Sequence, residues 1–216
     1  MPEVIRELAM FPLGSVLFPG MPLPLRVFEP RYVALLSTVL DATEREFGVV
    51  LIERGSEVGG GDTRFGIGTV ARIVSVEVGE GLIVLLARGT DRFEVTEWLG
   101  EDPFPRARVR ELGPLVLGPE DQDGLVEAER VVRGTLARQS EFVEPLWSPD
   151  VALSDDPAER LWQLAGIAPI GSLDHQALLR SPTAADLIAH LVEETQAAGD
   201  SVAARWSDEL EDDDPA

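Results

Sequence analysis

The chain has 216 residues, 44% of them hydrophobic, which is enough for one large domain or two small ones with a real core. It contains no cysteine, so a disulfide framework and a thiolate metal site are excluded. Acidic residues outnumber basic ones by 39 to 18, and every basic residue is arginine. Without lysine, the chain cannot supply a Walker-type phosphate lysine, a Schiff-base lysine or a Ser–Lys dyad.

The negative charge is concentrated in the second half of the chain. Residues 119–216 hold 22 acids and six arginines (net −16), whereas residues 1–118 hold 17 acids and 12 arginines (net −5). The second half would therefore repel nucleic acid. No apolar run approaches the roughly 20 residues of a membrane span, and the first residues lack the basic-then-apolar order of a secretory signal. We expect a cytoplasmic protein.

Residues 11–32 predict two strands joined by a tight turn. Apolar runs over 11–18 and 23–28 are separated by a Pro-Gly pair that suits a type II turn. Pro22 and Pro24 remove two backbone donors from one edge of the second strand, so we expect that edge to stay unpaired.

A helix with one buried face is predicted over 30–41, and a buried strand over 47–52. The glycine triplet at 59–61 indicates an exposed loop rather than a phosphate cradle, because a strand pattern follows it and not a helix. Residues 65–112 are mostly strand, and they include the longest aliphatic run of the chain, at 82–87.

Three arginines, Arg106, Arg108 and Arg110, alternate with apolar residues and so share one face of a strand. One interpretation is a site for an anion or an acidic partner. The alternative, which alternating charges favour, is a solvated face or one paired with the acidic second half of the chain.

After Gly118-Pro119 the hydrophobic period becomes helical, with helices predicted within 120–147, from Asp156 onward, over 172–180 and over 181–197. The fold class is thus α+β. We expect a β domain over 1–117, a helical subdomain over 118–197 and an acidic, disordered tail over 198–216.

Catalytic chemistry finds little support in the sequence. The two histidines, His175 and His190, stand in no metal or catalytic motif, and each is expected to be a packed or surface side chain. The abundant carboxylates give no basis for choosing an acid–base pair. We therefore expect no enzyme activity, no cofactor and no metal.

Five ordered runs of the first half closely resemble the N-terminal substrate-binding domain of the Lon proteases. They are FPLGSVLFPGMPLPLRVFEPRY, FGVVLI, FGIGTVARI, RGTDRFEV and PFPRARV, and SLDHQALLRSPTAADLIAHL in the helical half is similar to that family's closing helices. The likeness extends to about Leu191. It implies a PUA-like β-barrel or sandwich joined to a helical bundle, and recognition of unfolded or damaged protein. The chain ends where a protease would continue into its ATPase module, so we expect a stand-alone recognition module without proteolysis.

The leading hypothesis is a non-enzymatic module that binds polypeptide, a protein quality-control adaptor that works with a separate protease or ATPase. The candidate contact residues are Phe18, Met21, Leu23, Phe28 and Tyr32, although each could instead belong to the core. One alternative is a PUA-like protein that binds RNA through the three alternating arginines. Another is an enzyme or small-molecule-binding protein with a pocket between the β and helical parts.

Overall fold

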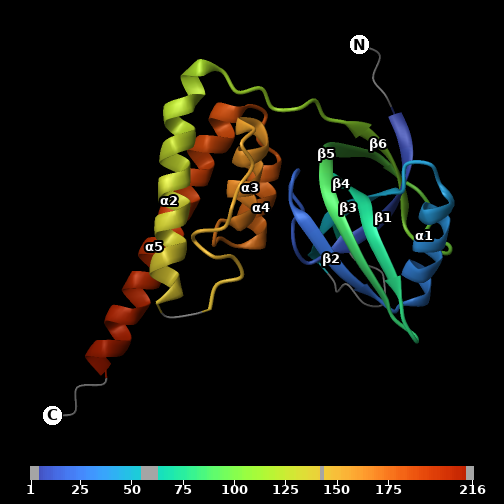
Figure 1. Ribbon diagram of the computed structural model, residues 1–216, viewed down its shortest axis with the longest axis horizontal. Coiled ribbons are helices and arrows are strands. Elements are labelled where there is room, and N and C mark those ends of the chain that lie inside the picture. The colour runs from blue at the N-terminus through green and yellow to red at the C-terminus, as the bar shows by residue number, and fades with distance from the viewer. Residues whose placement is uncertain (1–4, 55–62, 142–143, 213–216) are drawn as a thin grey trace. The chain divides into compact units, whose positions relative to one another are not determined.

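A computed structural model describes the backbone of residues 5–54, 63–141 and 144–212 (Figure 1). It describes the side chains over 5–53, 63–141 and 144–200. The chain divides into two compact units, Met1–Pro114 and Leu115–Ala216. The sequence placed this boundary after residue 117. No helix among the described residues combines the length and apolarity needed to cross a membrane. The predicted glycine loop at 59–61 lies outside the described residues.

Over its described residues, the first unit is a mixed six-stranded sheet with one helix. Its elements are β1 (Ile5–Leu13), β2 (Pro22–Val27), α1 (Pro30–Asp41), β3 (Glu46–Arg54), β4 (Thr63–Val78), β5 (Ile83–Trp98) and β6 (Arg106–Glu111). The strand order is β2-β5-β4-β3-β1-β6, and β5 also pairs with β6. Five strands therefore close into a ring, while β2 lies outside it and pairs with β5. Only the β1–β3 pairing is parallel among the described strands.

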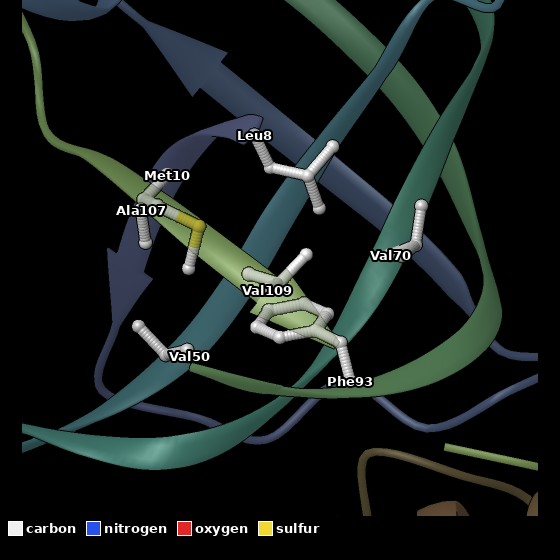
Figure 2. Packing of buried hydrophobic residues seen from close by; sticks show 7 residues of the cluster. All are labelled: Leu8, Met10, Val50, Val70, Phe93, Ala107 and Val109. Atoms are coloured by element: carbon white, nitrogen blue, oxygen red, sulfur yellow. The ribbon is translucent and has the colours of Figure 1, made fainter. Parts of the chain in front are cut away.

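The interior of the ring is a single apolar cluster. Figure 2 shows side chains from five strands pointing toward a shared centre, namely Leu8, Met10, Val50, Val70, Phe93, Ala107 and Val109. Met10 and Phe93 have no exposed surface. Burying a side chain of this size stabilises the fold by roughly 1.5–3 kcal/mol, so this cluster is a principal source of the unit's stability.

The tight turn before β2 is confirmed. Met21 donates its backbone N–H to the Phe18 carbonyl at 3.2 Å, and Gly20 has φ of 76°. The first strand, however, spans residues 5–13 rather than 11–18. The segment after it leaves the sheet and crosses β5 at Gly89, where a Cβ atom would lie 2.2 Å from the Phe18 carbonyl oxygen. Only glycine permits this crossing.

The predicted helix over 30–41 is confirmed as α1. Glu29 is its N-cap, Pro30 occupies the first turn, and the helix buries Tyr32, Leu35, Leu36 and Val39. The i, i+3, i+4, i+7 spacing of these residues is the pattern that predicted it.

The second unit consists of helices. They are α2 (Gln122–Ser140), α3 (Pro157–Ile167), α4 (Ser172–Leu179) and α5 (Ala184–Asp212), and α5 packs along α2 (Figure 1). Asp156 caps α3 by accepting a hydrogen bond from the Glu159 N–H at 2.8 Å. The last helix, which the sequence predicted to end at 197, continues to Asp212. Extending a helix that is already packed costs less than nucleating one, and residues 201–212 contain several good helix formers.

Candidate functional site

An exposed apolar surface lies on β2 and the first half of β5. Pro22, Pro24 and Arg26 are exposed, whereas the alternate residues of β2 are half-buried or buried. Pro24 pairs with Leu86, and Arg26 pairs with Val84. Residues opposite each other in an antiparallel ladder share a face, so these side chains form one outward surface.

Leu86 and Val84 expose 38% and 42% of their surface, and Phe28, next in the alternation after β2, exposes 61%. Such exposure of large apolar side chains grouped on one face is typical of an interaction surface. We call this surface the β2–β5 face; it comprises Pro22, Pro24, Arg26, Phe28, Val84 and Leu86.

A pocket of about 100 Å³ opens beside Phe28. Its walls are mainly apolar, from Phe11, Leu13, Leu25, Val27, Phe28 and Tyr32, and Arg26 and Glu29 also line it. The rings of Phe11 and Tyr32 stack with centroids 4.0 Å apart, and both side chains are buried. Sites for drug-sized ligands span about 300–1,000 Å³. This pocket is instead of a size to accept part of one apolar side chain.

The five predicted contact residues separate into core and surface. Phe18, Met21 and Tyr32 are buried, with 1%, 7% and 4% exposure, Leu23 is half-buried, and Phe28 is exposed. The prediction that Met21 offers binding surface is therefore wrong.

The reason for the burial of Met21 is a tertiary contact. Gly89 donates its backbone N–H to the Met21 carbonyl at 2.9 Å, and Gly20 donates to the Gly89 carbonyl at 2.9 Å. These bonds hold the turn down on β5, so the methionine packs into the core.

The three alternating arginines of β6 are each engaged by a glutamate. Arg106 contacts Glu7 at 3.1 Å, while Arg108 and Arg110 form ion pairs with Glu97 and Glu94. These partners belong to β1 and β5 of the same unit, not to the acidic second half of the chain. The guanidinium groups are thus paired within the sheet, which weighs against an anion site there. Because the pairs are partly exposed, each contributes little to stability.

Val84, Leu86 and the two prolines are surface residues that sequence reasoning did not select. The aliphatic run at 82–87 is the sequence feature from which Val84 and Leu86 could have been predicted as surface residues. An antiparallel strand with one solvated face normally alternates apolar and polar residues, so an unbroken run indicates an apolar outer face.

The two histidines, His175 and His190, both lie in the helical unit and are separated in the sequence. Nε2 of His175 lies 3.1 Å from the Ala168 carbonyl oxygen, and burial lowers the pKa of this imidazole. His190 is exposed. Within the described ranges, no three His, Asp or Glu residues are arranged to hold a metal ion.

Comparison with known proteins identifies the family to which the chain belongs. The family model for the ATP-dependent protease La (LON) substrate-binding domain matches residues 7–197. The chain belongs to this LON domain family. The resemblance predicted from the ordered runs is therefore confirmed.

Among curated proteins, the Lon protease of Magnetococcus marinus is 39% identical over 108 residues, which is 48% of this chain and 13% of that protein. Lon protease 2 of Herpetosiphon aurantiacus is 29% identical over 183 residues, covering 80% of this chain and 22% of that protein. The chain thus matches only a small part of the length of these relatives.

Two solved structures share the fold. The Lon N-terminal domain protein from Xanthomonas campestris superposes with a TM-score of 0.58 at 28% identity, covering 83% of this chain and 92% of that one. The N-terminal domain of the Mycobacterium avium complex Lon protease gives a TM-score of 0.65 at 15% identity, covering 88% and 98%. The predicted α+β class is confirmed by these neighbours and by the sheet and helices described above.

Proposed function

We propose that this LON domain binds unfolded or damaged polypeptide through the β2–β5 face. The observation that carries the proposal is the exposure of Phe28, Val84 and Leu86 together on one outward surface. Burial of apolar area stabilises a complex by roughly 25 cal/mol per Å², and it does so without a fixed hydrogen-bond pattern. That property suits partners of varied sequence.

In this proposal the bound polypeptide contacts side chains of the face and does not add to the sheet as a further strand. β2 pairs with β5, and no other described strand pairs with it. Pro22 and Pro24 lack the N–H groups that an added strand would require on the open edge. An apolar side chain of the bound polypeptide would instead pack on Phe28 and enter the pocket beside it.

Two finer assignments accompany the binding role. We describe the closed five-strand ring as the PUA-like barrel that the sequence led us to expect, a description supported by the β5–β6 pairing. The matched model describes a substrate-binding domain, which supports a non-enzymatic module. We propose that this module acts as a quality-control adaptor for a separate protease or ATPase.

Crosslinking to a panel of chemically unfolded proteins tests the binding role. We expect wild-type chain to capture them, and the double variant Phe28→Asp/Leu86→Glu to capture at least about tenfold less, because both substitutions place charge on the apolar face. Val126→Asp is the matched control, since Val126 is 68% exposed on α2 in the other unit. Equal capture by wild-type and the double variant would refute the proposal.

A further inference from the structure

A groove of about 450 Å³ runs between α2 and α5 in the helical unit. It is lined by Arg130, Val131, Gly134, Arg138, Gln196 and Asp200. Gly134 lies four residues from each of the two arginines, and a Cβ atom there would meet no atom within 4 Å. The missing side chain therefore leaves open space between two guanidinium groups on the same helix face.

Arg138 is positioned by contacts with both helices. One terminal nitrogen of its guanidinium donates to Oγ1 of the buried Thr135 at 3.2 Å. The same nitrogen would lie 2.8 Å from a Cβ atom on Gly199 of α5. The guanidinium of Arg138 thus lies closely against the backbone of α5. A side chain at position 199 would collide with it.

The charge of Arg138 sets it apart from the other arginines of α2. Arg130 donates two hydrogen bonds to Glu127, at 2.8 and 2.5 Å, and Arg133 donates to Glu129 at 2.8 Å. Among side chains that the structure describes, Arg138 has no carboxylate partner, and Asp200 in the same groove has no ion pair. Arg138 therefore brings a positive charge to the groove, within a region that carries a net charge of −16 over 119–216.

We propose that this groove binds a carboxylate group of a polypeptide, either the chain terminus or an acidic side chain. The guanidinium fork of Arg138 matches the two oxygens of a carboxylate. The Gln196 amide supplies a further donor, and Asp200 an acceptor for a backbone N–H of the same ligand. Because the surrounding charge is negative, long-range attraction cannot account for such binding, so direct contact in the groove must supply it.

The test uses three rhodamine-labelled octapeptides built from glycine, serine and alanine, which lack large apolar side chains. One has a free carboxyl terminus, one is the C-terminal amide, and one is the amide with a single central glutamate. Fluorescence anisotropy at low salt should show the full chain binding one or both carboxylate peptides at least about tenfold more tightly than the plain amide. The peptide that binds identifies the source of the carboxylate.

Two variants in the groove and one outside it make the test specific. Arg138→Gln should reduce binding about tenfold or more, and Gly134→Leu, which fills the groove without changing charge, should do the same. Arg180→Gln, an exposed arginine at the end of α4, should bind like wild-type. Equal binding of all three peptides, or binding unchanged by Gly134→Leu, would overturn the proposal. Phe28→Asp should leave this binding intact, so the groove and the β2–β5 face are tested separately.

Discussion

The aromatic rings of Phe11 and Tyr32 lie almost parallel, with an interplanar angle of 12° and centroids 4.0 Å apart. This contact joins β1 to the first turn of α1 and lines the pocket beside Phe28. Phe47 of β3 packs against Phe11 with centroids 5.9 Å apart. The surface proposed to bind polypeptide therefore rests on a packed aromatic group, so the pocket and the stability of the sheet depend on the same side chains.

Removal of the Tyr32 ring should destabilise the β unit. Tyr32→Ala deletes a buried aromatic side chain, and we expect a loss of about 3–5 kcal/mol, of which the stacking accounts for about 0.5–1.5 kcal/mol. Tyr32→Phe keeps the ring and should retain most of the stability. Hydrogen exchange of peptides from β1 and β3 reports the opening free energy of this unit. Equal exchange in Tyr32→Ala and wild-type would show that the stack is not a structural contact.

Aspartate at positions 21 and 28 should distinguish the core from the surface. Met21 is 7% exposed, so Met21→Asp buries a charge and opens a cavity, at a cost of at least about 3 kcal/mol. Phe28 is 61% exposed, so Phe28→Asp should change the free energy of unfolding by no more than about 0.5 kcal/mol.

Urea denaturation of both variants, followed by circular dichroism, measures the difference. If Met21→Asp captures less unfolded protein, the cause would then be unfolding of the β unit. If Phe28→Asp captures less, the cause would be damage to the binding surface. A Phe28→Asp variant as unstable as Met21→Asp would contradict the exposed position of Phe28.

Local features of the fold were predictable from the sequence because their causes are local. The spacing of four apolar residues after Pro30 defines α1, and Pro19-Gly20 defines the turn. The closure of the strands into a ring was not predictable in the same way. Residues such as Phe93 and Glu94 of β5 pair with both β4 and β6, and periodicity along one strand does not identify its neighbours.

The candidate site was predictable only in part, for the same reason. Phe28 was a candidate contact residue that the sequence could equally assign to the core, and the structure exposes it. Met21 looked equally suitable in sequence, and its burial depends on hydrogen bonds with Gly89, which is far away in the chain. Similarly, the arginines of β6 alternate like an anion site, but their glutamate partners come from other strands.

The stability of the helical unit should fall when the pH drops below the usual pKa of histidine. Burial lowers the pKa of His175 from its ordinary value of 6.5, and the nearby Ala168 carbonyl and Asp174 carboxylate only oppose this shift. The unfolded chain therefore takes up a proton at a higher pH than the folded chain does. Stability is fully present above about pH 6.5 and decreases as the pH falls below it.

Thermal unfolding followed at 222 nm between pH 7.5 and pH 5 checks this expectation. The melting temperature of wild-type should decrease over this range, and His175→Gln, which has no titrating imidazole, should show a smaller decrease. His190→Gln removes an exposed imidazole from α5 and serves as the matched control, which should follow wild-type. The same pH dependence in His175→Gln and wild-type would mean that a group other than His175 causes the loss.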